Sequence, residues 1–164
     1  MTTTKLLRRI GLRRRPSLLN RVATEIGKGL VAGLAGTLAM TISQMIEMRL
    51  SHRKPSTSPA DAAGKVLGVQ ARDQAGKTRF ANAVHWAYGT AWGLVRAALG
   101  GTRRSRLWAP LAQLAAVQTT AMLMLPGLGV APPVTKWGAK AISKEVMHHT
   151  VYATAADAAY RALS

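Results

Sequence analysis

The chain has 164 residues, a length typical of one domain, and it contains no cysteine. The lack of cysteine excludes disulfide bonds, cysteine-based metal sites and a cysteine nucleophile. The chain carries 23 Lys and Arg against 6 Asp and Glu, a formal net charge of +17, which is typical of nucleic-acid-binding proteins and of membrane proteins with basic ends. Here the basic residues flank long uncharged stretches, such as residues 107–135. This favours a membrane protein with no nucleic-acid partner over the alternative of a basic soluble protein.

The first predicted element is a basic arm over residues 1–27. Eight Lys or Arg lie within the first 28 positions, and the basic part is longer than that of a typical secretory signal. We expect a cytoplasmic segment, amphipathic or disordered, that binds anionic lipid headgroups through Arg13, Arg14 and Arg15. An Arg-rich, acid-poor start is also compatible with a mitochondrial transit peptide.

A membrane domain is predicted over residues 28–164. A helix needs about 20 predominantly apolar residues to cross the hydrocarbon, and candidate spans cover residues 29–47, 82–99, 107–126 and 142–163. The last span holds several ionisable residues, so a helix lying at the interface is its alternative. The sequence therefore predicts an all-α fold, a polytopic membrane protein with a four-helix transmembrane bundle.

The connecting segments set the expected orientation. In the first loop, residues 48–80, Ser58 followed by Pro59 predicts an N-cap and a short helix over ADAAGKVLGV. The turn at residues 100–106 is basic, like the N-terminal arm, which places both chain termini on the cytoplasmic side of a bacterial inner membrane. The Arg side chains expected to contact lipid headgroups in that turn, with Arg96 reaching phosphates beside them, are Arg103, Arg104 and Arg106.

Small residues follow one face of the first two spans. Gly29, Gly33 and Gly36 share a face of the first, and Gly89 and Gly93 form a G-x-x-x-G motif in the second. Such faces let two helix backbones approach closely in a bilayer. We expect the first span to pair with the second within one chain; a homo-oligomer built on the same faces is the alternative.

Ionisable residues are expected to meet at the outer side of the bundle, because alternating spans bring the relevant helix ends together. The predicted cluster contains Glu47, His85, Glu145, His148, His149 and Tyr152. We expect no metal and no cofactor there, since one Glu-x-x-His motif is too few for a di-iron bundle. The open alternatives are a proton- or ion-responsive cluster, a mononuclear metal site, axial haem ligation, and polar side chains that only hold the helices together.

No catalytic motif is present: the chain lacks G-x-S-x-G, H-E-x-x-H and a Walker loop. We therefore expect a non-enzymatic integral inner-membrane protein with an accessory or envelope-homeostasis role and a pH-responsive His/Glu cluster. The alternatives are a small proton or ion transporter or channel, and a structural subunit of a larger membrane complex. The lipid bilayer is the expected partner.

Four motifs occur in a recognisable order: GLVAGLAGTLAMT, NAVHWAYGTAWGLV, LPGLGVAPP and HHTVYATAADAAYRAL. Over residues 28–162 this order resembles the YagU-like small bacterial inner-membrane proteins of unknown function. The resemblance implies a membrane location and a helical fold, and it implies no chemistry. The chain departs from the family pattern late in the third span, where Gln118 and Thr119 stand in place of an acidic residue.

Overall fold

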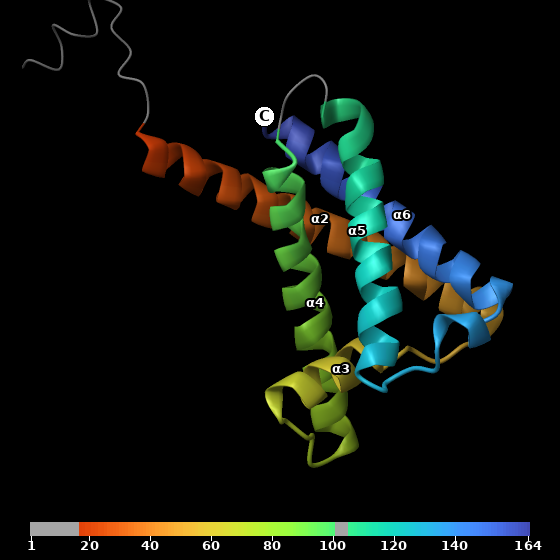
Figure 1. The fold of residues 1–164 in the computed structure, drawn as a ribbon. Helices are drawn as coiled ribbons and strands as arrows, with labels where there is room; N and C mark the ends of the chain where they lie inside the picture. The colour runs from red at the N-terminus through yellow and green to blue at the C-terminus, as the bar shows by residue number, and fades with distance from the viewer. Residues whose placement is uncertain (1–16, 101–104) are drawn as a thin grey trace, which may run out of the picture.

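The structure is a computed structural model that describes residues 17–100 and 105–164, without the side chains of residues 105–107. Within these ranges the protein contains helices and no strand, so the predicted all-α class is confirmed. Arg13, Arg14, Arg15, Arg103, Arg104 and the side chain of Arg106 lie outside the described part. The elements are α2 (Leu18–Ser51), α3 (Ser58–Leu67), α4 (Gln74–Ala98), α5 (Ser105–Gly127), the 3-10 helix η1 (Val134–Lys136) and α6 (Ala139–Ala162) (Figure 1).

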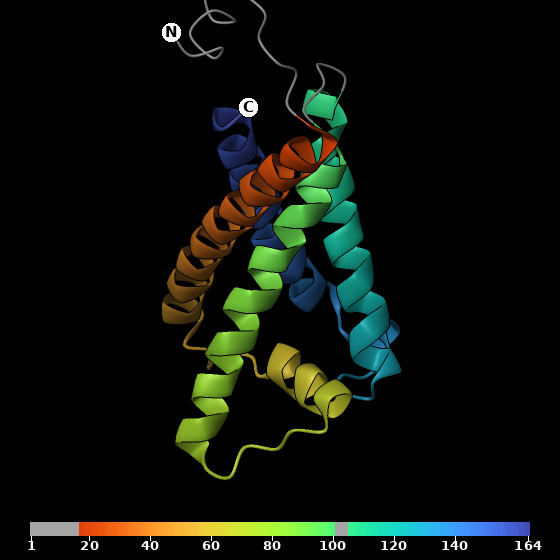
Figure 2. The same cartoon turned by 90° about the vertical axis from the view of Figure 1, so that its left-hand side faces the viewer.

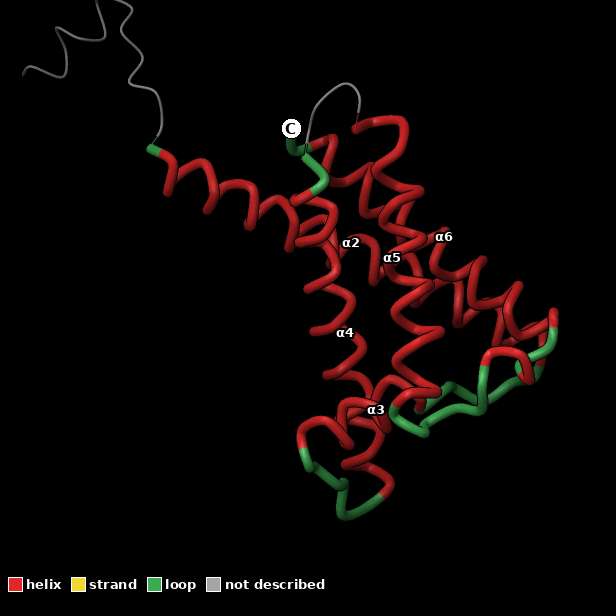
Figure 3. The backbone as a smooth tube through the Cα atoms, viewed as in Figure 1, coloured by secondary structure: helices red, strands yellow, loops and turns green. Residues whose placement is uncertain are grey.

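The four long helices, α2, α4, α5 and α6, alternate in direction along the bundle (Figure 2). The connections at residues 52–57, 68–73 and 128–138 gather at one end, which we call the loop end (Figure 3). The start of α2, the end of α4, the start of α5 and the C-terminus lie toward the opposite end, which we call the terminal end (Figure 2).

Polar caps make two helices longer than the predicted spans. α2 begins after Ser17, whose hydroxyl accepts a hydrogen bond from the backbone N–H of Asn20 at 3.2 Å. α4 begins after Asp73, whose carboxylate accepts one from the N–H of Gly76 at 2.6 Å. Because these caps satisfy N–H groups that have no partner within the helix, each helix can start outside its apolar stretch.

The short helix predicted in the first loop is confirmed as α3. The prediction that Ser58 is its N-cap is wrong: the helix includes Ser58, and Thr57 precedes it. The Thr57 hydroxyl donates to the carboxylate of Asp61 at 2.7 Å, which holds the first turn closed. α3 packs against α4 and α5, and Lys65 Nζ donates to the carbonyl oxygen of Leu128 at 2.7 Å. These contacts close the loop end of the bundle.

The backbones of α2 and α4 touch where the two helices cross. A Cβ atom added at Gly29 would lie 2.9 Å from the carbonyl oxygen of Gly93, and one added at Gly93 would lie 2.5 Å from the backbone nitrogen of Gly33. Only glycine leaves room for backbones this close. The pairing expected between the first two glycine faces therefore occurs within one chain.

Two further glycines receive side chains from neighbouring helices. A Cβ atom at Gly89 would lie 3.0 Å from Cγ2 of Thr37, so the threonine of α2 occupies the space above α4. A Cβ atom at Gly36 would lie 2.9 Å from the ring of Tyr152 on α6. α2 is thus packed closely against both α4 and α6.

Several large polar side chains are buried in the interior, whereas many large apolar side chains are exposed. The largest fully buried side chains are Arg96, Tyr160, Gln113, Thr37 and Asp157. Along α2, large apolar side chains are exposed: Leu18, Leu19, Val22, Ile26, Leu30, Val31, Leu34, Leu38, Ile42, Met45, Ile46 and Leu50. Of the described helices, α2 is the one that is long and apolar enough by itself to cross a membrane.

Candidate functional site

Buried polar side chains from α2, α4, α5 and α6 form a polar core that extends between the two ends of the bundle. Its buried members are Thr37, Arg96, Gln113, Gln118, His148, His149 and Asp157. A polar group removed from water costs free energy unless it finds a partner, and the cost is large for a charge. The partners of these side chains therefore show what the core can do.

At the loop end, Glu47 of α2 joins three segments of the chain. Its carboxylate accepts hydrogen bonds from Arg53 Nη2 at 2.8 Å and from Ser51 Oγ at 2.8 Å, and it forms an ion pair with Lys144 of α6. Its Oε2 also lies 3.9 Å from Nε2 of His148. We call Glu47, Ser51, Arg53, Lys144 and His148 the Glu47 cluster.

His148 is the buried titratable member of this cluster. Its Nδ1 lies 2.9 Å from the hydroxyl oxygen of Ser43, and its Nε2 has no hydrogen-bond partner among the described residues. Arg53 and Lys144 already pair with Glu47, and Arg53 also attracts the carboxyl group of Glu145. Protonation of His148 would therefore add a positive charge to those of Arg53 and Lys144.

The other two histidines and the tyrosine predicted for this site each have a separate partner on a different helix. These pairs are His85 Nε2 with Thr41 Oγ1 at 2.9 Å, His149 Nδ1 with Gln118 Oε1 at 2.7 Å, and the Tyr152 hydroxyl with the carbonyl oxygen of Gly89 at 2.7 Å. Glu145 is half-buried, and its carboxyl group interacts with Arg53 through charge.

Of the predicted cluster, the structure brings Glu47 and His148 within 4 Å and distributes the others among separate polar contacts. Across residues 17–100 and 105–164, no group of three or more His, Asp or Glu side chains is placed to hold a metal ion. The geometry supplies interhelical hydrogen bonds and one carboxylate–imidazole pair at the loop end.

A second charged group, the Arg96 cluster, lies at the terminal end and contains Arg96, Asp157, Tyr160 and Arg161. Arg96 is fully buried; its Nε donates to Asp157 Oδ1 at 2.8 Å, and its Nη1 donates to the carbonyl oxygen of Gly100 at 2.9 Å. The guanidinium also lies 4.2 Å from the centroid of the Tyr160 ring. The second oxygen of Asp157 is 2.6 Å from Nη2 of Arg161. The cluster ties α4 to α6 through an ion pair and a cation–π contact.

The prediction that Arg96 reaches lipid phosphates is wrong, because its guanidinium points into the bundle toward Asp157. Asp157 and Arg161 also have the i,i+4 spacing of a local ion pair on one helix, and this spacing gives no indication of the interhelical pair with Arg96. A better signal was available. One arginine and one aspartate within apolar helical segments each need a partner, and the simplest partner for each is the other.

Tyr160 connects the Arg96 cluster to α2. Its hydroxyl donates to the carboxylate of Glu25, which also pairs with Lys28 at 3.0 Å. The hydrogen bond from Tyr160 and the bond from Lys28 lower the pKa of Glu25 below its ordinary value. Glu25 precedes the expected span at residues 29–47.

Sequence reasoning did not single out the two buried glutamines of α5 as parts of the site. Gln113 Nε2 donates to the carbonyl oxygen of Trp92 at 3.2 Å, and Gln118 Oε1 accepts a hydrogen bond from His149 Nδ1 at 2.7 Å. Gln113 Oε1 and Gln118 Nε2 have no partner within the described part of the chain. The available signal for their burial was the presence of two amide side chains in the uncharged stretch over residues 107–135.

Comparison of the chain with protein-family models, curated proteins and solved structures finds no match. Its function is therefore inferred from the polar core and the apolar surface.

Proposed function

We propose that the protein is a non-enzymatic integral protein of the bacterial inner membrane whose four long helices cross the bilayer. The observation that carries this proposal is that α2 exposes a row of large apolar residues, whereas Arg96, Asp157 and His148 are buried. Lipid can surround the exposed apolar side chains, and the interior of a helical bundle can hold the buried polar and charged ones. The motifs that resemble the YagU-like proteins support the same location.

Helix length supports four spans. α4, α5 and α6 contain 25, 23 and 24 residues. At a rise of about 1.5 Å per residue each is longer than the hydrocarbon thickness of about 30 Å. Their alternating directions return the chain to the opposite end at every connection (Figure 2). The charged Lys140 and Arg161 lie near the two ends of α6, where they can reach water or headgroups.

Two single-cysteine variants test the location and the topology. The natural chain has no cysteine, and Ser56 at the loop end and Ser164 at the terminal end are both exposed. We expect a membrane-impermeant thiol reagent to label Ser56→Cys in intact cells and Ser164→Cys only after lysis. Equal labelling of the two variants before lysis would contradict the topology, and release of the protein from membranes by alkaline carbonate would contradict integral insertion.

The Glu47 cluster supports an accessory, pH-responsive role for this membrane protein. Four groups face the His148 imidazole with charge or the capacity to acquire it: Glu47, Arg53, Lys144 and His149. Because burial disfavours the charged form of His148, with Arg53 and Lys144 adding to this effect and Glu47 opposing it, a proton on His148 weakens the contact between α2 and α6 at this end. Acidification therefore loosens the loop end, and neutral pH keeps it closed.

The pH dependence of unfolding in detergent tests this role. The wild type and His148→Gln are both measured at pH 8 and at pH 5. Over this range we expect the free energy of unfolding to fall by about 1–3 kcal/mol more in the wild type than in His148→Gln. This difference is the usual cost of a buried polar group without a compensating partner. His52→Asn is the control, because His52 is exposed in the first loop. The same pH dependence in wild type and His148→Gln would exclude His148 as the responsive group. A proton flux through liposomes containing the wild type would favour the transporter alternative.

A further inference from the structure

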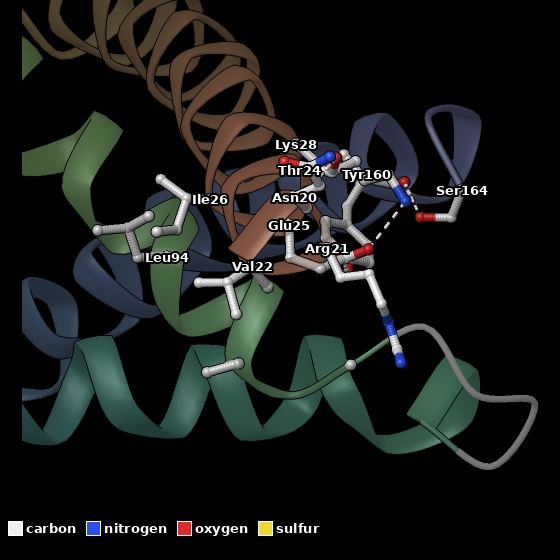
Figure 4. A pocket seen from close by; sticks show the side chains of 13 residues that line it. Asn20, Arg21, Val22, Thr24, Glu25, Ile26, Lys28, Leu94, Tyr160 and Ser164 are labelled. Atoms are coloured by element: carbon white, nitrogen blue, oxygen red, sulfur yellow. Dashed lines mark hydrogen bonds and ion pairs between the residues drawn. The ribbon is translucent and has the colours of Figure 1, made fainter. Parts of the chain in front are cut away.

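A groove of about 820 Å³ opens at the terminal end, between the start of α2, the end of α4 and the end of α6 (Figure 4). Its lining is divided by chemistry. Apolar side chains make up one part: Val22, Ile26, Leu94, Ala97 and Ala98. Polar and basic side chains make up the other: Asn20, Arg21, Thr24, Lys28, Tyr160 and Ser164. An occupant that matches both parts must be amphipathic.

The charges of the groove favour an anion. The one acidic residue in its lining is Glu25, and Lys28 and the Tyr160 hydroxyl already bind that carboxylate. The Arg21 side chain is exposed and attracts Glu25 through charge, without a hydrogen bond to it among the described residues. Lys28 uses one of its ammonium hydrogens on Glu25 and keeps others for a ligand. One guanidinium and part of one ammonium group therefore remain available to an external negative group.

The apolar part of the groove continues onto the outer surface of the bundle. Val22 is 48% exposed, Ile26 46% and Leu94 39%, and Leu30 extends the same row along α2. This surface leads from the basic mouth toward the residues that the proposed span places in hydrocarbon. A hydrocarbon chain attached to the anion could therefore follow α2 without leaving an apolar environment.

We propose that this groove binds one anionic glycerophospholipid. Its phosphate lies at Arg21 and Lys28, and an acyl chain lies along Val22, Ile26 and Leu94. The inference rests on the proposed membrane location. Binding in this groove differs from a general attraction between basic residues and headgroups, because the apolar part of the groove also contributes to affinity.

Native mass spectrometry of the full-length protein in detergent tests the site. We expect phosphatidylglycerol to bind more tightly than phosphatidylcholine with the same acyl chains. The double variant Arg21→Gln/Lys28→Gln is expected to weaken phosphatidylglycerol binding by about fivefold for each basic side chain removed. Ala98→Trp keeps the charge and fills the exposed part of the groove at Ala98, so it is also expected to weaken binding.

The matched control removes two exposed basic residues at the loop end, in Arg49→Gln/Lys54→Gln. Equal weakening in this control, or equal affinity for the two lipids, would reduce the effect to general electrostatics and overturn the site. Displacement of phosphatidylglycerol by millimolar inorganic phosphate would show a free-anion site and would also overturn it. Membrane fractionation of the wild type separates the two proposals. A protein that stays in carbonate-washed membranes without lipid preference refutes this inference alone, whereas a released protein refutes the membrane location.

Discussion

Replacing Asp157 with asparagine is expected to lower the free energy of unfolding by about 3–5 kcal/mol, because it leaves the fully buried Arg96 without its carboxylate partner. The loss should be measured by denaturant or thermal unfolding of the purified protein in detergent. We expect Asp157→Asn to remain folded and helical at low temperature, because the glycine crossing of α2 and α4 does not involve Asp157.

Two further variants give this prediction its controls. Asp61→Asn removes a charge that pairs with Lys77 at 3.4 Å while both side chains are about 40% exposed. The amide oxygen of Asn can still accept the hydrogen bond from Thr57, so the loss should be below about 1 kcal/mol. The double variant Arg96→Met/Asp157→Leu removes both buried charges and should recover most of the stability lost in Asp157→Asn. Similar losses in Asp157→Asn and Asp61→Asn would mean that the Arg96–Asp157 pair is not buried.

Replacing Gly93 with leucine is expected to separate α2 from α4 and to cost at least about 3 kcal/mol of unfolding free energy. Even a Cβ atom at this position would lie 2.5 Å from the backbone nitrogen of Gly33, and neither backbone can move without displacing its whole helix. Unfolding in detergent measures the loss. If Gly93→Leu fails to fold, Gly93→Ala provides a graded version of the same clash and should still be clearly destabilised.

Gly27→Leu is the matched control for the glycine crossing. Gly27 lies on α2, and a Cβ atom there would meet nothing within 4 Å. Leucine has a higher helix propensity than glycine by up to about 1 kcal/mol, so Gly27→Leu should be neutral or slightly stabilising. Equal destabilisation by leucine at the two positions would show that close backbone packing is not the cause.

The parts of the fold that could be predicted from the sequence depend on local patterns. Four apolar stretches, a Pro-containing helix start and two faces of glycine predicted the helices and the crossing of the first two. These features follow from helix geometry and length, which neighbouring residues determine. The helix ends were less accurate, because caps such as Ser17 and Asp73 lie outside the apolar windows.

The contacts of the site could not be predicted in the same way. Spacing shows which residues share a face of one helix, but a partner on another helix depends on the rotation and the axial position of both helices. His149 therefore meets Gln118 of α5, whereas its neighbour His148 meets Ser43 and Glu47 of α2. One residue of separation on a helix turns a side chain by about 100°, enough to assign it to a different neighbour.

The length of α2 has a mechanical consequence for a protein that spans a bilayer as proposed. Its 34 residues extend about 51 Å, well beyond a hydrocarbon thickness of about 30 Å. Such a helix adapts to its surroundings by tilting or by protruding, and a thinner bilayer demands more tilt. Figure 1 shows α2 strongly inclined to α4, and the backbones of Gly29, Gly33 and Gly93 are in close contact where the two helices cross. Hydrophobic mismatch acting on α2 would thus be transmitted to α4 as a rigid-body rotation.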